Sequence, residues 1–386
     1  MPRSFDGVRV LDLTHVLAGP FCTYQFAVLG ADVIKIESPT MPDCARGRGP
    51  DATQNAALRG LNFEVQGGNK RALALNLKDV RGRDILLRLA AEADVLVDNY
   101  RAGALAALGL DDATLQRANP ALILCSITGY GQSGPRAHVN AYDNVLQAAS
   151  GIMTRTGTAA SGPIKTGASF VDYASGWCAA FAIASALFQR ERDGRGQRID
   201  CAMFDAALTM MAPELAATLQ GTTPIRAEAG LGCYATADGL LMLGAFTPQQ
   251  NHQLWIALER PDFAALESWE QLWSHASAMR DVLTQRLSER DAHQWMMFFH
   301  EIGIPAERVR GLDEAARDPQ LAHRALLDRA NEHSPVVPVA AFRFEHDGPT
   351  LDRPAPGVGE HSDEILRELG LAPVDIASLR AAGVVG

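Results

Sequence analysis

The chain has 386 residues, of which 47% are hydrophobic and 21% are charged, and its formal net charge is −10. This composition is typical of a globular protein rather than a disordered one, and the length predicts two or three domains at about 150 residues each. The excess of acidic groups argues against a nucleic-acid-binding surface, because phosphates require clustered cations.

The cysteines and the apolar runs restrict the compartment in which the protein works. Its six cysteines are scattered and form no C-x-x-C pair, which is typical of a reducing compartment and provides no zinc motif. The N-terminal residues lack the apolar core of a secretory signal. The longest apolar run, residues 177–188, is shorter than the roughly 20 residues that a membrane span needs. We therefore expect a cytoplasmic protein with no metal site and no membrane partner.

Short apolar segments alternate with helical ones through the first two hundred residues. Strands are predicted at residues 8–13, 32–37, 72–77, 94–98, 121–127 and 197–203. Helices are predicted at residues 20–29, 78–93 and 173–190. Such alternation is typical of βαβ units, and uninterrupted apolar strands indicate a mostly parallel sheet that is buried on both faces. The fold class expected is therefore α/β.

The pattern changes near Gly221, where a second, smaller domain is predicted. A hairpin is expected at residues 234–246 around the turn sequence Ala237-Asp238-Gly239, and helices rich in Trp, His and Met follow to about residue 303. Residues 334–358 hold seven prolines or glycines and are predicted to be a connector. A last helix is predicted at residues 362–369.

Residues 129–134 match the pattern G-x-G-x-x-G directly after a predicted strand. In a dinucleotide-binding domain this pattern opens a helix, and an acidic residue follows about 20 positions on. Here Pro135 follows at once, and Thr154 stands 20 positions beyond the last glycine. A nicotinamide site is therefore disfavoured, and a loop whose backbone approaches another ligand is the favoured interpretation.

Asp172 lies between an apolar segment and the long predicted helix. One interpretation is an N-cap, in which the carboxylate accepts backbone N–H bonds at a helix start. The other is an ionised carboxylate, held at the positive helix end and poised for covalent catalysis on an acyl group. The two interpretations are compatible.

Cations stand near the ends of several predicted strands. Ligands of a parallel α/β sheet bind outside the carboxyl ends of its strands, where Lys78 and Arg101 are placed for phosphates. Lys70 and Arg71 precede the third strand, and His15 follows the first. Solvated surface cations, and a loop histidine for His15, are the alternative interpretations.

Eight short motifs match one known family in order along nearly the whole chain. They are residues 8–20 (VRVLDLTHVLAGP), 30–37 (GADVIKIE), 69–71 (NKR), 98–103 (DNYRAG), 129–135 (GYGQSGP), 171–176 (VDYASG), 194–197 (GRGQ) and 359–361 (GEH). Each motif alone is weak, but eight in the same order are specific. On these residues the chain resembles the class III CoA-transferases, the family of the carnitine, bile-acid and formyl-CoA transferases.

The resemblance implies a fold and an assembly. The expected fold is a Rossmann-like large domain with a mostly parallel sheet, plus a smaller α+β domain. We expect residues 1–220 to form the N-terminal part of the large CoA-binding domain and residues 221–330 to form the small domain. Residues 331–386 would then be a connector and the part that completes the large domain. Chains of this family typically interlock in pairs, so a homodimer is expected.

The resemblance also implies a reaction between an acyl-CoA and a small carboxylic acid. Asp172 matches the family's nucleophile, which attacks the thioester and forms in turn a mixed anhydride and an enzyme–CoA thioester. A free acid then takes the CoA. Asp143 matches a carboxylate that orients groups near the nucleophile, and a turn residue is its alternative interpretation. No cofactor beyond coenzyme A as substrate, and no metal, is expected.

The CoA-binding positions carry over residue by residue. They are His15, Val16, Ala18, Leu75, Lys78, Asn99, Tyr100 and Arg101. Some oxalate-type members have cations at three positions that are different here, namely Ser38, Ala107 and Asn140. We therefore expect the phosphates to be held differently, by Arg46, Lys70 or Arg101, with Arg71 and Asn140 as further CoA-binding positions. The glycine-rich lid of the formyl-CoA:oxalate enzymes is missing near residues 230–232, which argues against oxalate and favours a small di- or branched-chain acid.

Two alternatives stay open. The same fold hosts α-methylacyl-CoA racemases, which use a histidine in a G-H-D-I-N-Y segment together with an aspartate. The corresponding stretch here is residues 141–146, where Tyr142 replaces the histidine. A phenol with a pKa of about 10 is a poor base near neutral pH, which favours a transferase. A protein that binds CoA without catalysis is the second alternative.

Overall fold

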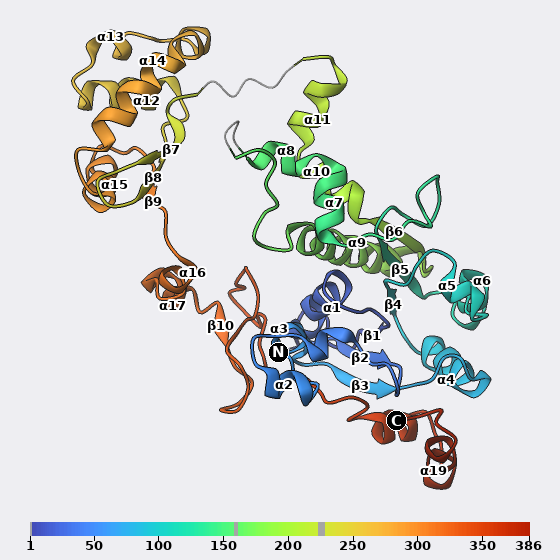
Figure 1. Cartoon of the computed structure of the whole chain (residues 1–386). Coiled ribbons are helices and arrows are strands. Elements are labelled where there is room, and N and C mark those ends of the chain that lie inside the picture. The colour runs from blue at the N-terminus through green and yellow to red at the C-terminus, as the bar shows by residue number, and fades with distance from the viewer. Residues whose placement is uncertain (1, 158–160, 223–227) are drawn as a thin grey trace. The chain divides into compact units, whose positions relative to one another are not determined.

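A computed structural model describes residues 2–157, 161–222 and 228–386 of the chain (Figure 1). The chain divides into two compact units. The larger unit comprises Met1–Leu215 together with Arg324–Gly386, and the smaller unit comprises Ala216–His323. The predicted boundaries lie after residues 220 and 330, whereas these divisions fall after residues 215 and 323.

The larger unit contains a six-stranded sheet in which all neighbouring strands are parallel. The strands are β1 (Arg9–Asp12), β2 (Asp32–Glu37), β3 (Arg71–Ala74), β4 (Val95–Asp98), β5 (Ile123–Thr128) and β6 (Arg198–Ala202). Their order across the sheet is β3-β2-β1-β4-β5-β6. The predicted α/β class and parallel sheet are confirmed. This order is that of the doubly wound dinucleotide-binding folds, and it reverses direction between β1 and β4.

Helices cover both faces of the sheet, so nearly every residue of β1 to β5 is buried, whichever face its side chain points to. On one face, Val10, Val33 and Val97 pack with α1 (Ala18–Val28) and α9 (Phe170–Asp193). On the other face, the neighbouring residues Leu11, Ile34 and Leu96 pack with helices from three parts of the chain. These are α4 (Val80–Ala91), α6 (Asp112–Ala118), α18 (Ser362–Glu368) and α19 (Pro373–Ala381).

Helix α9 is the longest helix of the larger unit and lies directly against α1. By length and composition it is the one helix in the described ranges that could cross a membrane. Its Ala179 and Ile183 are nevertheless completely buried in the core beneath the sheet. Gly176 permits this packing, because a Cβ there would lie 2.7 Å from the backbone oxygen of Ala18. These contacts are those of a core helix.

Several short helices of the larger unit were not predicted from the sequence. They are α2 (Ala52–Ala56), α3 (Leu61–Gly67), α5 (Ala104–Ala107), α7 (Asp143–Ser150), α8 (Ile152–Thr156) and α10 (Met203–Thr209), with a 3-10 turn at Cys44–Gly47. Helix α11 (Ala212–Leu219) crosses the boundary between the units. The predicted connector contains the second strand of the small antiparallel pair β10 (Leu327–Asp328) and β11 (Val337–Pro338).

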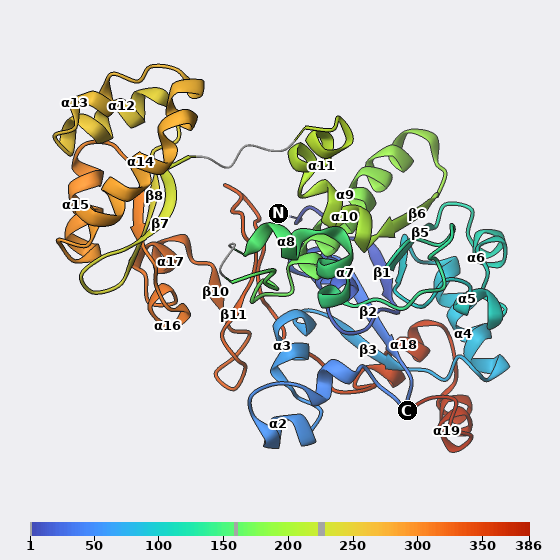
Figure 2. The ribbon, with the colours of Figure 1, turned by 45° about the horizontal axis from the view of Figure 1, so that its top comes forward.

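The C-terminal segment completes the larger unit beside β3 (Figure 2). The backbone N–H of Ala74 donates to the Ser362 hydroxyl at 3.2 Å, and Leu75 forms an antiparallel bridge with Val385. The backbone N–H of Gly386 donates to the Ala74 carbonyl at 3.1 Å. The outer edge of the sheet is therefore paired and covered, which removes a site for edge-to-edge association.

The smaller unit is an antiparallel sheet packed with helices. Its strands are β7 (Leu231–Ala235), β8 (Leu240–Gly244) and β9 (Ala306–Arg308), in that order. The predicted hairpin turn at Ala237-Asp238-Gly239 joins β7 to β8. The helices are α12 (Pro248–Ala257), α13 (Pro261–Ala264), α14 (Trp269–Leu287), α15 (Ala292–Glu301), α16 (Leu312–Ala315) and α17 (Pro319–Arg324), the last of which crosses the boundary by one residue. Trp255, Trp295 and Phe299 are fully buried and form the centre of this unit's core.

Candidate active site

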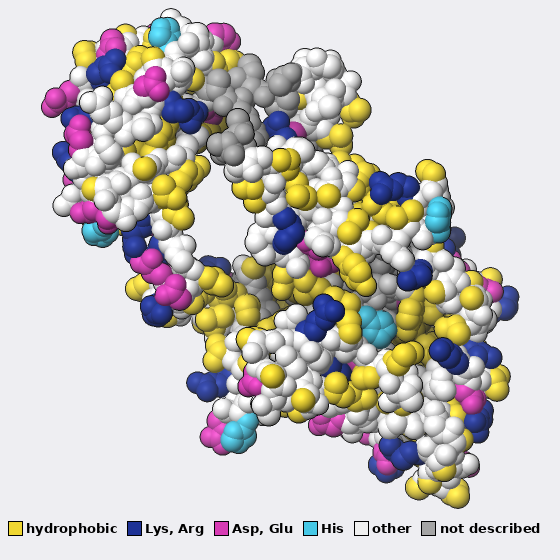
Figure 3. Space-filling view, in the orientation of Figure 1, with side chains coloured by type: hydrophobic (Ala, Val, Ile, Leu, Met, Phe, Trp, Pro, Cys, Tyr) yellow, Lys and Arg dark blue, Asp and Glu magenta, His cyan; other side chains and the backbone are white. Residues whose placement is uncertain are grey.

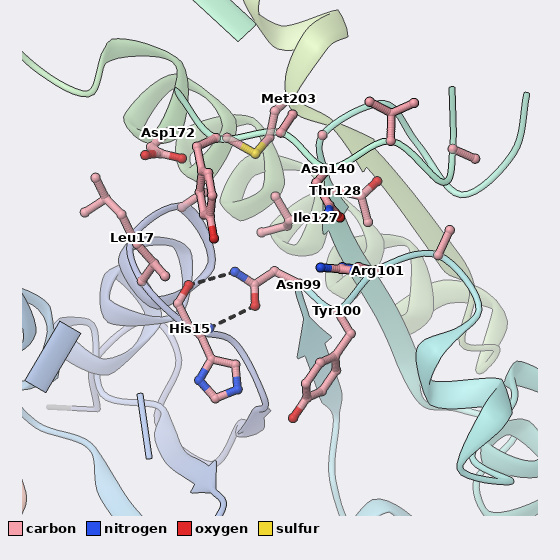
Figure 4. A pocket seen from close by; sticks show the side chains of 18 of the residues that line it. His15, Leu17, Asn99, Tyr100, Arg101, Ile127, Thr128, Asn140, Asp172 and Met203 are labelled. Atoms are coloured by element: carbon pink, nitrogen blue, oxygen red, sulfur yellow. Dashed lines mark hydrogen bonds between the residues drawn. The ribbon is translucent and has the colours of Figure 1, made fainter. Parts of the chain in front are cut away.

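A cavity of about 290 Å³ opens at the carboxyl ends of β1, β4 and β5, within the larger unit (Figure 4). This is where the strand order reverses, the place at which open α/β sheets bind their ligands. Eight of the residues predicted to form the site line it together. They are His15, Val16, Ala18, Asn99, Tyr100, Arg101, Asn140 and Asp172.

Asp172 lies in the first turn of α9, two residues beyond its start. The N-cap is Ser169, whose side chain makes no capping bond. Asp143, the first residue of α7, takes that role from a different helix. One of its carboxylate oxygens accepts the backbone N–H of Val171 at 2.7 Å and that of Asp172 at 3.3 Å. The interpretation of Asp172 as an N-cap is therefore wrong, and its own carboxylate faces the cavity.

The ionisation of Asp172 also differs from the prediction. Burial and the neighbouring charge of Asp143 raise the pKa of Asp172 to about 7. A helix N-terminus alone would have kept the carboxylate ionised, but its effect is outweighed here by desolvation and by the like charge of Asp143. Near neutral pH, Asp172 therefore exists in both protonation states.

Asp143 is buried, and each of its oxygens is hydrogen-bonded. The oxygen that does not face α9 accepts a bond from the side-chain amide of Gln147 at 2.6 Å, one turn further along α7. The amide oxygen of Gln147 accepts the backbone N–H of Thr166 at 2.9 Å. Nothing in the sequence pointed to Gln147, which is an amide within an otherwise ordinary short helix.

The loop after β1 forms one wall of the cavity and is fixed through its backbone. The side-chain amide of Asn99 accepts the His15 N–H at 2.9 Å and donates to the His15 carbonyl at 2.7 Å (Figure 4). Val16 has a φ of 72°, which is rare for a β-branched residue. Its N–H donates to Asp43 at 3.0 Å, and its carbonyl accepts from Gln66 at 2.7 Å. Such strain persists only where the surroundings hold it, and it is concentrated at functional sites.

Buried charges support this loop from below and account for Lys70. Its ammonium donates to Asp12, to the Pro20 carbonyl and to the Thr23 hydroxyl, each at 2.9 Å, and the residue is 2% exposed. Lys35 donates to the Thr14 carbonyl and lies 3.5 Å from Asp43. The prediction that Lys70 holds a phosphate is therefore corrected, because its charge is used to anchor the loop and does not reach the cavity.

Three further predictions for the CoA site need the same correction. Arg71 begins β3, at the edge of the sheet opposite the cavity, and it pairs with Asp32 at 2.6 Å, Glu368 at 2.7 Å and Glu364 at 2.8 Å. Arg46 is fully buried and pairs with Glu37 at 2.6 Å. The side chain of Leu75 is buried in the core beneath α4 and α18. None of these three side chains lines the cavity.

Arg101 is exposed and lines the cavity, so its guanidinium is available to a ligand. Lys78 is also exposed at the carboxyl end of β3, but it lies outside the cavity lining. His15 packs edge-on against Tyr100, with ring centroids 5.7 Å apart. Burial, and then the charge of Lys35, lower the pKa of His15, so its ring is neutral near pH 7.

The glycine-rich segment after β5 does not open a helix. Gly131 and Gly134 have φ angles of 88° and 93°, and the next helix begins only at Asp143. The backbone N–H of Gln132 donates to the Asp200 carboxylate at 2.9 Å, which ties the segment to β6. The segment therefore lacks the strand-to-helix turn of a dinucleotide fingerprint.

Several known proteins are similar to this chain in sequence. The profile of "CoA-transferase family III" matches residues 5–362. A succinyl-CoA:glutarate CoA-transferase of Mus musculus is 33% identical over 95% of this chain and 86% of its own length. An acetyl-CoA:oxalate CoA-transferase of Acetobacter aceti is 35% identical over 84% of this chain and 85% of its own.

A solved structure agrees with these matches. The crystal structure of a CAIB/BAIF family protein from Brucella suis aligns with a TM-score of 0.81 at 30% identity, covering 96% of this chain and all of that one. The match spans both units, and the larger unit holds an acidic side chain in a cavity at the strand-order reversal. The chain therefore belongs to CoA-transferase family III and is a CoA-transferase.

Proposed function

We propose that Asp172 is the nucleophile of the transferase and that a CoA thioester occupies the cavity it faces. The observation that carries this proposal is that Asp172 is the one carboxylate among the described residues lining the cavity. Its backbone is held by Asp143, and its carboxylate is partly desolvated. A rigidly held carboxylate whose solvation is incomplete is a stronger nucleophile than one in water.

The reaction proceeds through two covalent states of Asp172. Its carboxylate oxygen attacks the thioester carbonyl of the donor, the carbon–sulfur bond breaks, and CoA leaves as the thiolate. The thiolate then attacks the aspartyl carbonyl of the mixed anhydride, which releases the donor acid and leaves Asp172 as a CoA thioester. An acceptor carboxylate reverses these steps, so that the new acyl-CoA departs and the carboxylate of Asp172 is regenerated.

The raised pKa of Asp172 contributes to this chemistry. Each covalent state is neutral at the aspartyl carbonyl, so bond formation relieves the repulsion between Asp172 and Asp143. The ionised ground state is destabilised relative to the intermediate, which lowers the barrier to attack. The same repulsion limits the fraction of enzyme that is ionised below about pH 7.

The cavity offers a CoA thioester one exposed cation and one aromatic platform. Arg101 provides the cation for phosphate, and the Tyr100 and His15 rings lie beside it. Asn99 keeps its amide on the His15 backbone and fixes that wall. We place the nucleotide end of CoA near Arg101, with Lys78 as a more distant cation, and the thioester at Asp172.

We infer that the acceptor is a small dicarboxylic acid. The two relatives described above are named for glutarate and oxalate, both of which are dicarboxylates. The sequence near residues 230–232 lacks the glycine-rich lid expected of an oxalate enzyme, so succinate and glutarate are preferred over oxalate here.

We also infer a homodimer. Phe181 and Phe188 lie two turns apart on the outward side of α9 and are 77% and 64% exposed. Hydrophobic side chains (yellow) also gather on the face of the larger unit that Figure 3 shows, and contiguous exposed apolar patches are typical of an interaction surface. Size-exclusion chromatography with light scattering tests the dimer by comparing wild type with Phe181→Asp, since the variant should elute as a monomer.

The six cysteines are all free, which is consistent with a reducing cytoplasm.

The test of the nucleophile is an exchange assay read by mass spectrometry. Labelled succinate is mixed with glutaryl-CoA, and the appearance of labelled succinyl-CoA is measured. Asp172→Ala and Asp172→Asn should abolish exchange, whereas Asp193→Asn, at the exposed far end of the same helix, should retain it. In wild type, hydroxylamine added with acyl-CoA should modify Asp172. Full exchange by Asp172→Ala would overturn the proposal.

The racemase alternative has a separate measurement. Tyr142, at the position of the racemase histidine, is 69% exposed and belongs to the rim of the cavity. Incubating a 2-methylacyl-CoA in D₂O without any acceptor acid should give no exchange at its α-carbon. Deuterium incorporation that depends on Asp172 would favour the racemase.

A further inference from the structure

Gln147 is a completely buried amide whose two ends are both hydrogen-bonded. Its nitrogen donates to Asp143 at 2.6 Å, and its oxygen accepts the backbone N–H of Thr166 at 2.9 Å. Thr166 lies in the segment that leads into α9. The side chain therefore connects α7 to the segment that precedes the first turn of α9. That first turn carries Asp172.

The carboxylate of Asp143 joins Gln147 to the first turn of α9. One oxygen receives the Gln147 amide, and the other receives the Val171 and Asp172 N–H groups. The helix has no side-chain cap of its own. The first turn of α9 is thus capped from α7, and the direction of that cap depends on the amide behind it.

Few other charges face this arrangement. Of the helices that pack against α7, α8 carries Arg155, which pairs with Glu214 at 3.9 Å. Helix α10 carries Asp205, which is exposed. Helix α9 contributes Asp172 and the exposed Tyr173, and α1, which packs on α9, has no charged residue. The segment before α9 carries the exposed Lys165, whose ammonium donates to the Thr166 carbonyl at 2.6 Å. Gln147 is therefore the side-chain donor that holds Asp143 in the described structure.

We propose that Gln147 is a positioning residue of the transferase, whose amide holds the carboxylate of Asp143 against the first turn of α9 and thereby fixes Asp172. The proposal rests on the assignment of Asp172 as the nucleophile. The amide of Gln147 donates to Asp143 and accepts from Thr166 at once without adding charge. Leucine would leave one oxygen and one N–H without partners, and glutamate would place a second acid against Asp143.

Two substitutions separate positioning from simple structural support. Gln147→Leu removes both bonds and should lower kcat by at least about tenfold, because small displacements of a reacting group cost this much or more. The KM for the acyl-CoA should stay within about twofold, since no wall of the cavity changes. Ser150→Ala, on the same helix, is the matched control and should leave both constants unchanged. The hydroxyl that it removes donates to the backbone carbonyl of Gln147 at 3.4 Å.

Gln147→Glu provides a measurement, the pH dependence of kcat, that a purely structural role of Gln147 would not change. Its protonated acid can donate to Asp143 as the amide does, whereas its ionised form repels Asp143. The kcat of this variant, divided by that of wild type at the same pH, should therefore rise as the pH falls from 8 to 6. Circular dichroism at each pH confirms that the compared proteins are folded.

The outcomes distinguish this proposal from the one it rests on. If wild type shows no hydroxylamine modification of Asp172, the nucleophile assignment fails. If wild type is modified, but folded Gln147→Leu has the kcat of wild type, the positioning role is overturned. Should Gln147→Leu not fold, a ratio for Gln147→Glu that is constant with pH would overturn it instead.

Discussion

One carboxylate oxygen of Asp143 lies 3.3 Å from the backbone nitrogen of Asp172 and accepts its N–H, so a capping bond and a like-charge repulsion join the same two residues. Together with burial, this neighbouring charge raises the pKa of Asp172 to about 7. The contact that fixes the nucleophile's backbone is thus also one that resists its ionisation. Several expectations depend on this relationship.

The rate of transfer should depend on the ionisation of Asp172. The ionised form attacks, so kcat/KM should rise with pH and level off above a pKa of about 7. Asp143→Asn removes the repelling charge, and the rising limb should move to lower pH. Rates measured from pH 5 to 9 with both proteins check this. If the rising limb of kcat/KM lies at the same pH in Asp143→Asn as in wild type, Asp143 does not raise the pKa of Asp172.

Stability should change with pH in the opposite sense. The pKa of Asp172 is raised from its ordinary value of 3.8 to about 7 on folding, so the folded state holds the proton more tightly. The contribution of Asp172 to stability should therefore decrease as the pH rises between these values, and Asp172→Asn lacks this contribution. The Tm of the variant minus that of wild type should grow from pH 4 to pH 7 and then stay constant. A difference that does not change with pH would contradict this.

Lys70 should matter for folding rather than for substrate affinity. Lys70→Met leaves the buried Asp12 carboxylate without its ion-pair partner, which costs about 3–5 kcal/mol at sites of this kind. Denaturant unfolding measures the loss. Lys78→Met, at an exposed position, should leave the free energy of unfolding nearly unchanged. Equal stability of the two variants would show that the buried network does not support the loop after β1.

Arg101 should act on CoA binding with little effect on the chemical step. Arg101→Gln removes the exposed guanidinium of the cavity, so the KM for the acyl-CoA should rise about tenfold while kcat changes little. The increase should shrink at high salt, because exposed charges are screened. Arg117→Gln, on α6 and outside the cavity lining, serves as the control. A fall in kcat with unchanged KM would place Arg101 at the reacting atoms instead.

The parallel sheet could be predicted because the local sequence of each strand indicates that the strand is buried. Residues 121–127 are a largely apolar run, and β5 forms at Ile123–Thr128. Residues 32–37 carry Val33, Ile34 and Ile36, and β2 forms over that range. Helix α7 was missed because Asp143–Ser150 is short and only three of its residues are buried. Such a helix is stabilised by tertiary packing more than by propensity, which a single sequence does not reveal.

The cavity could be predicted in outline, while the ionisation of its groups could not. Asn99 and Arg101 follow strand β4 directly, so the topology alone brings them to the site. Lys70 is a cation beside a strand in the same way, but its partner Asp12 stands 58 positions earlier, and only the fold shows that the two charges neutralise each other. The pKa of Asp172 similarly depends on Asp143, 29 positions away.

The bridge between Leu75 and Val385 joins two segments that are made at different times during synthesis. Strand β3 is translated first, and Val385, which pairs next to its end, follows Leu75 by 310 positions. At translation speeds of about 5–20 residues per second, the intervening stretch takes roughly 15–60 s to make. For that time, a nascent sheet exposes an unpaired edge that another chain could occupy. The requirement for a chaperone should therefore be greatest before Val385 leaves the ribosome.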